Sequence, residues 1–139
     1  MRVLRVVALV LLALGGLSLS GCAPGDERST GEKAAAAAVR GVNRARKDAT
    51  LGRLERLRAV LERYRIDHGE YPAGDSLAAI GDRLVPQYTP RLETRDSWGN
   101  DLSYESSGGS YTIVSSGPDG ARGTPDDIRL QDGAVSGGP

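Results

Sequence analysis

Residues 116–128 read Ser-Gly-Pro-Asp-Gly-Ala-Arg-Gly-Thr-Pro-Asp-Asp-Ile, and the rest of the chain is organised around this acidic stretch. It holds three carboxylates (Asp119, Asp126 and Asp127), three glycines and two prolines, and no apolar run that a core could use. Because calcium takes carboxylate and carbonyl oxygens as ligands, such a loop can wrap a hard cation. It can equally be an ordinary turn, since Pro and Gly favour turn conformations without an ion. The acidic spacing of an EF-hand is absent, so any metal site here is of another type.

Strand-forming residues lie on both sides of this stretch. Before it, apolar and polar residues alternate over residues 101–106, a Ser-Gly-rich turn follows, and residues 110–116 are β-branched and aromatic. This pattern predicts a hairpin. After the acidic stretch, the alternation over residues 127–131 predicts a third strand antiparallel to the second. Residues 133–139 have the composition of a disordered tail.

Upstream, residues 33–68 contain no proline, are rich in Ala, Leu, Arg and Glu, and therefore favour a helix. Its apolar positions Leu54, Leu57, Leu61 and Tyr64, widened by Val60, share one face, which predicts a buried stripe. Gly69 can adopt the left-handed conformation that ends helices, and the Tyr-Pro pair that follows cannot continue one. A short second helix over residues 76–85 is expected, capped by Asp75 or Ser76.

The first half of the predicted long helix has a different character. Its apolar residues are small (Ala and Val), and Arg40, Arg44, Arg46 and Lys47 surround them. Residues 33–68 carry net charge +6 and residues 69–139 carry −6. We expect this half to project toward a membrane or to pack on another subunit rather than on the chain's own core. An ordinary solvated helix face is the alternative interpretation.

The N-terminus has the features of a secretory signal in residues 1–21, with two arginines, a short apolar run and small residues before Cys22. The sequence Leu-Ser-Gly-Cys resembles the lipobox of bacterial lipoproteins, which implies that Cys22, the only cysteine, is lipidated. A free cysteine after a plain signal is the alternative. Residues 22–32 predict a flexible tether. The resemblance implies a lipid-anchored envelope protein, facing the periplasm from the outer membrane if there are two membranes, and otherwise on the outer face of the cell membrane.

Four motifs in order resemble the C-terminal domain of the major pseudopilin of type II secretion systems. They are the long helix, residues 67–72 (Asp-His-Gly-Glu-Tyr-Pro), residues 96–100 (Asp-Ser-Trp-Gly-Asn), and residues 111–128. The resemblance implies an α+β, pilin-like fold over residues 33–132, with the long helix packed on a three- to four-stranded antiparallel sheet. It also implies a Ca²⁺ site with side-chain ligands Asp119, Asp126 and Asp127 and backbone carbonyls near Ser116 and Ala121.

One departure from that family bears on function. A pseudopilin has a prepilin peptidase site and an apolar helix of about twenty residues, whereas this chain has the lipobox in that place. We therefore expect a non-enzymatic, calcium-binding accessory or interaction component of a secretion or pilus-like machine, with other envelope proteins as partners. A free-standing envelope lipoprotein that uses the fold to bind a protein is the alternative. The single histidine, His68, has no partner for catalysis. Nucleic acid is not an expected partner because the basic helix lacks interleaved aromatics, and no small-molecule substrate is expected.

Overall fold

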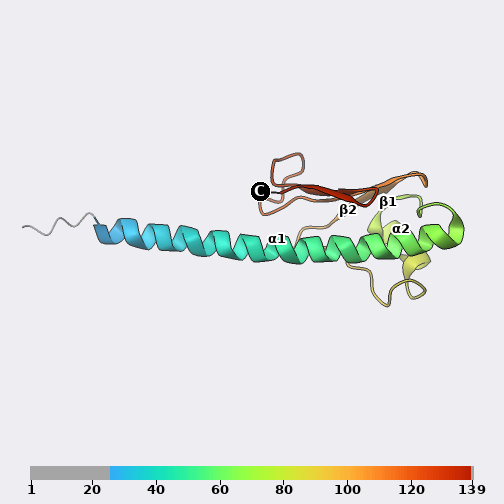
Figure 1. Ribbon diagram of the computed structural model, residues 1–139, viewed down its shortest axis with the longest axis horizontal. Helices are drawn as coiled ribbons and strands as arrows, with labels where there is room; N and C mark the ends of the chain where they lie inside the picture. The colour runs from blue at the N-terminus through green and yellow to red at the C-terminus, as the bar shows by residue number, and fades with distance from the viewer. Residues whose placement is uncertain (1–25, 139) are drawn as a thin grey trace, which may run out of the picture.

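The fold is an α+β arrangement in which one long helix packs against a five-stranded antiparallel sheet (Figure 1). A computed structural model of the chain describes residues 26–138. Its elements are α1 (Asp26–His68), β1 (Gly74–Ser76), α2 (Leu77–Leu84), β2 (Ser103–Ser106), β3 (Tyr111–Ser115), β4 (Ile128–Gln131) and β5 (Ala134–Gly137). The predicted fold class and the pilin-like order of elements are therefore confirmed. The predicted signal, Cys22 and residues 22–25 of the tether lie outside the described residues.

Helix α1 is 43 residues long, which corresponds to about 65 Å at 1.5 Å per residue. Its predicted stripe is confirmed: Leu54, Leu57 and Leu61 are buried, and Val60 and Tyr64 are partly buried against the same core. The helix ends before Gly69, whose φ of +83° is the left-handed conformation predicted for it. Only the C-terminal half of α1 therefore contributes to the core.

The start of α1 corrects the prediction of a tether over residues 22–32. The helix begins at Asp26, so residues 26–32 are helical. The physical reason is cooperativity, because adding a residue to an existing helix gains a hydrogen bond without the cost of a new nucleus. No proline follows Pro24 in this stretch to stop that extension.

The sheet is a meander in the order β1-β2-β3-β4-β5, and every neighbouring pair is antiparallel. It has more strands than the three or four predicted, because β1 pairs with β2 and because residues 134–137 form β5. The prediction of a disordered tail over residues 133–139 is thus wrong for β5. Asp132 and Gly133 both have positive φ, as a two-residue hairpin turn requires, and Asp-Gly is a strong signal for such a turn.

The core lies between the C-terminal half of α1, helix α2 and the inner face of the sheet. Helix α2 contributes Leu77, Ile80 and Leu84, and Ser76 is its cap, with its hydroxyl accepting a hydrogen bond from the Ala79 N–H at 3.2 Å. The sheet contributes the residues that alternate inward: Leu102, Tyr104, Tyr111, Ile113, Ile128 and Leu130. The Tyr104 hydroxyl is satisfied inside this core, where it donates to the Pro72 carbonyl at 2.7 Å.

The N-terminal half of α1 extends past the end of the sheet (Figure 1). Val39 and Val42 there are 60% and 51% exposed, so this half does not pack on the chain's own core, as expected from its small side chains. Within residues 26–138, no helix combines the length and the apolar character needed to cross a bilayer.

Candidate functional site

The acidic loop, residues 116–127, connects β3 to β4 at the end of the sheet beside the middle of α1. The structure places its five predicted ligand residues in different surroundings. Ser116 is buried at the base of the loop, Asp126 and Asp127 are half-buried, and Asp119 and Ala121 are exposed. The loop thus has a fixed base and an exposed tip.

Hydrogen bonds within the loop fold its carboxylates back on its own backbone. Asp126 accepts from the Asp119 N–H at 3.3 Å and from the Thr124 hydroxyl. Asp127 accepts from the Gly123 N–H at 2.8 Å, and Asp119 accepts from the Ala121 N–H at 2.8 Å. The two ends of the loop are therefore brought together, with Asp126 next to the backbone of Asp119.

Gly117 allows this close approach. Its φ is +63°, and a Cβ at this position would lie 2.5 Å from the Asp126 carbonyl oxygen and 2.8 Å from Asp126 Oδ2. A side chain would be strained by the backbone conformation and would also collide with Asp126. The loop closes as it does only because glycine occupies this position.

The donor set of the loop is the kind that calcium takes, namely carboxylate and carbonyl oxygens. One observation fits a cation directly: Asp127 Oδ1 is buried and has no hydrogen-bond partner, although a buried carboxylate oxygen normally has one. The Thr124 hydrogen bond lowers the pKa of Asp126 below its usual range, with the Asp119 N–H adding to the effect, so this carboxylate is ionised at neutral pH. In residues 26–138, however, no three His, Cys, Asp or Glu side chains are gathered closely enough to hold a metal ion.

A buried carboxylate that was not predicted as a site residue supports the base of the loop. Asp96 is 2% exposed, and its Oδ1 accepts from the backbone N–H groups of Trp98 and Asn100 at 2.9 and 2.8 Å. Its Oδ2 accepts from the Ser115 hydroxyl at 2.7 Å and from the Asn100 amide at 3.3 Å. The same Asn100 amide donates to the Gly117 carbonyl at 2.8 Å. Asp96 therefore joins the turn at residues 96–100, called the Trp98 turn below, to the first residues of the acidic loop.

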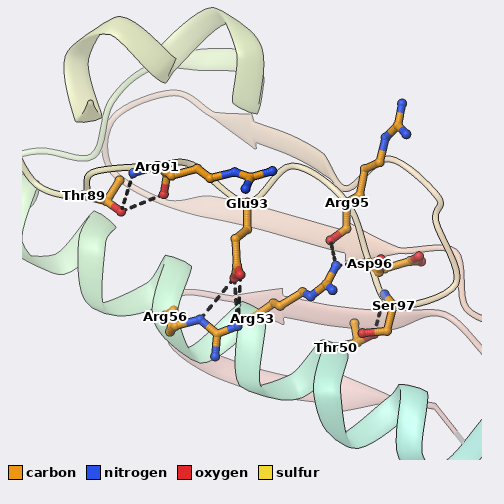
Figure 2. Close-up of polar contacts among 9 residues, drawn as sticks. All are labelled: Thr50, Arg53, Arg56, Thr89, Arg91, Glu93, Arg95, Asp96 and Ser97. Atoms are coloured by element: carbon orange, nitrogen blue, oxygen red, sulfur yellow. Dashed lines mark hydrogen bonds and ion pairs between the residues drawn. The ribbon is translucent and has the colours of Figure 1, made fainter. Parts of the chain in front are cut away.

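These contacts of Asp96 are called the Asp96 support below. Helix α1 holds the Asp96 support in place, as Figure 2 shows. Arg53 donates to the carbonyls of Arg95 and Asp96 at 2.7 and 2.8 Å, and the Ser97 N–H donates to the buried Thr50 hydroxyl at 3.1 Å. Farther along the same segment, Glu93 forms an ion pair with Arg56 at 2.9 Å. A continuous set of contacts thus runs from the helix through residues 93–100 to the acidic loop.

His68 is exposed at the end of α1 and stacks on Tyr64, with ring centroids 4.0 Å apart. Its Nδ1 lies 3.0 Å from the Tyr64 carbonyl oxygen and 3.4 Å from the Tyr88 hydroxyl. These contacts fix the ring against its own helix, and they contain no nucleophile activated by a base.

Comparisons with known proteins agree with the order of these elements. The family described as type II secretion system (T2SS), protein G matches residues 37–131, more than half of the chain. Searches of curated proteins and of solved structures gave no match. The matched span contains most of α1, strands β1 to β4, the Trp98 turn and the acidic loop. The chain therefore belongs to the type II secretion system protein G family, the major pseudopilins, and is a component of secretion machinery in the cell envelope.

Proposed function

We propose that this pseudopilin-family chain is a non-enzymatic, lipid-anchored component of the machinery whose acidic loop is ordered by calcium. The observation that carries the calcium proposal is the buried Asp127 Oδ1 without a hydrogen-bond partner, in a loop whose other donors are also oxygens. Asp119, Asp126 and Asp127 would hold the ion together with backbone carbonyls near Ser116 and Ala121. The ion would supply positive charge to three carboxylates that otherwise repel one another.

Binding would exchange hydrogen bonds for ion contacts. Asp119, Asp126 and Asp127 each accept a backbone N–H from within the loop, so part of the gain from the ion offsets the loss of these bonds. The Asp96 support fixes the loop base without using any of the three carboxylates. The proposed role of calcium is therefore to order the exposed tip and to hold the start of β4 against β3.

Titration calorimetry on the chelator-treated full chain in detergent tests this proposal. We expect calcium to bind with a dissociation constant of about 0.1 to 1 mM, the range of extracellular calcium modules, and magnesium to bind more weakly. Asp127→Asn keeps the shape of the side chain but removes its charge, so it should abolish the calcium signal. Asp82→Asn, an equal charge change on the exposed surface of α2, is the matched control. Calcium binding that Asp127→Asn leaves unchanged would rule out this site.

The lipid anchor rests on the sequence around Cys22, which lies outside the described residues. Acyl chains contribute about 0.8 kcal/mol per buried CH₂, and stable anchoring takes more than one chain. Intact-mass measurement of the chain purified from membranes should show the added mass of acyl chains. The Cys22→Ser variant should lack this added mass and should be found outside the membrane fraction. An unmodified Cys22 in the membrane fraction would contradict lipidation.

A further inference from the structure

A groove of about 710 Å³ lies between the middle of α1 and the loops at the end of the sheet. The helix forms one wall with Arg40, Arg44 and Lys47. The partly exposed apolar surface comes from Leu51 of α1 and Trp98, and Ile128 at the start of β4, which is 1% exposed, lies beneath it. The groove thus combines a basic wall with an apolar floor, and Asp126, one of the proposed calcium ligands, also lines it.

The three basic residues form a row because their spacings of four and three residues place them on one face of the helix. Within residues 26–138, no carboxylate forms an ion pair with Arg40 or Arg44. Lys47 donates to the Gly138 carbonyl at 3.0 Å, which closes one end of the groove. Two carboxylates, Asp48 and Asp126, also line the groove.

Trp98 lines the groove, is partly exposed, and is held by two hydrogen bonds. Its backbone N–H donates to the buried Asp96, and its indole N–H donates to Asn43 of α1 at 3.4 Å. Tryptophan and arginine are among the residues enriched at the hot spots of protein interfaces, and a side chain already held in place loses less freedom on binding.

We propose that this groove binds a short acidic segment of a partner protein in an extended conformation. Its carboxylates would pair with Arg40 and Arg44, and an apolar side chain between them would pack on Trp98 and Leu51. The groove volume lies in the range of about 300 to 1,000 Å³ that is typical of ligand pockets, which suits a short segment of a chain. The net charge of −6 on residues 69–139 would repel an acidic segment elsewhere and direct it to this wall.

Fluorescence anisotropy with the full chain in neutral detergent tests the proposal, and the probe is a labelled peptide of sequence Glu-Glu-Leu-Leu-Glu-Glu. Two further peptides serve as comparisons: one replaces Glu with Lys, and the other replaces Leu with Ser. We expect the Glu-Leu peptide to bind tightest and its affinity to fall with added salt, because the paired charges are exposed to screening. Equal binding of the Lys-Leu peptide would overturn the proposal.

Charge reversal at the groove gives the decisive comparison. Arg44→Glu should weaken binding about tenfold or more, because it replaces an attraction with a repulsion at the wall. Arg63→Glu makes the same change in net charge at an exposed position of α1 outside the groove and should leave the affinity within about twofold. Circular dichroism confirms that both variants fold. Equal weakening by the two variants would overturn the proposal.

Two other occupants are separated in the same series. Vesicles containing phosphatidylglycerol that bind in an Arg44-dependent way, without peptide binding, would overturn the proposal in favour of a lipid surface. Self-association that Arg44→Glu abolishes in sedimentation, again without peptide binding, would overturn it in favour of a second copy of the chain. Peptide binding that depends on Arg44 and on the two leucines supports it.

Discussion

At the scale of single residues, Asp96 shows how one buried carboxylate can connect two segments, the turn at residues 96–100 and the end of β3. Oδ1 holds the backbone of the Trp98 turn, and Oδ2 holds Ser115 and the Asn100 side chain. Oδ1 therefore stabilises the turn, and Oδ2 connects the turn to the base of the acidic loop. A substitution that changes only one of the two oxygens can therefore test the contact with the loop separately from the contact with the turn.

Asp96→Asn should keep the turn and release the loop base. The amide oxygen can still accept the two backbone N–H groups, but the NH₂ group would face the Ser115 and Asn100 donors, and a buried polar group left without a partner costs about 1 to 3 kcal/mol. Urea unfolding at neutral pH, with hydrogen exchange at Gly117 as a local probe, measures this loss.

Ser97→Ala is the control for that experiment. The Ser97 hydroxyl is buried in the same turn and has no hydrogen-bond partner, so its removal breaks no hydrogen bond and should not lower the free energy of unfolding. Similar losses for the two variants would show that the turn, and not the Asp96 connection, determines stability.

Asp126 gives a pH prediction at the same scale. Its pKa is lowered below the ordinary value of 3.8, chiefly by the Thr124 hydroxyl. A lowered folded pKa means that the ionised carboxylate stabilises the fold above the unfolded pKa, and that this contribution is lost as the pH falls through the folded pKa. The loss of stability on protonation of Asp126 is therefore expected in the acid range, below about pH 4.

Thr124→Val removes the hydroxyl and should raise the pKa of Asp126 toward its ordinary value. Titration of the side-chain carboxyl carbon by NMR, with chelator present, measures it directly. Thr112→Val, on the outer face of β3, is the matched control and should leave this pKa unchanged. An unaltered Asp126 titration in the Thr124 variant would remove the proposed cause of the shift.

At the scale of elements, the two halves of α1 differ in what stabilises them. The C-terminal half is held by side chains that are almost fully buried, such as Leu57 at 3% exposure. Leu57→Ala should lower the free energy of unfolding by about 2 to 5 kcal/mol, through lost burial and the cavity that remains. Urea unfolding monitored by circular dichroism measures the loss.

Ile66→Ala is the control on the same helix. Ile66 is 79% exposed, so its truncation should change stability by less than about 0.5 kcal/mol. A comparable loss for both variants would contradict the packing described for α1.

The elements that the sequence predicted well are those with a repeated pattern. The spacing of Leu54, Leu57 and Leu61 identified the buried face of α1, and the alternation around Ile128 and Leu130 identified β4. Elements without such a pattern were missed. Strand β5 is exposed at all four positions, so its sequence has no alternation of apolar and polar residues. Only the Asp-Gly turn before it indicates a hairpin.

The sequence predicted only part of the candidate site. Composition identified the acidic loop, because three carboxylates in so short a stretch are conspicuous. It could not identify the roles of Asp96 and Asn100, which depend on contacts with Ser115 and Gly117 nearly twenty residues away. The Asp-Ser-Trp-Gly-Asn motif was visible in the sequence as part of the family resemblance, but its support of the loop is a tertiary feature that no local pattern encodes.

At the scale of the whole molecule, opposite charges lie on the two structural parts of the chain. The exposed half of α1 is basic, and the sheet with its loops is acidic. The acidic loop lies where the two regions meet, next to the basic groove and joined to α1 through the Asp96 support. A cation in the loop would therefore stabilise the part of the molecule that connects the sheet to the helix.

Thermal unfolding of the full chain, in millimolar calcium and in chelator, tests the calcium proposal most directly. With a dissociation constant of about 0.1 to 1 mM, about 1 mM calcium adds about 0.4 to 1.4 kcal/mol to the free energy of unfolding, and each kcal/mol raises the Tm of a domain of this size by about 4 to 8 °C. We expect a Tm several degrees higher in calcium than in chelator, with a smaller shift in magnesium. The same Tm in calcium and in chelator would contradict it.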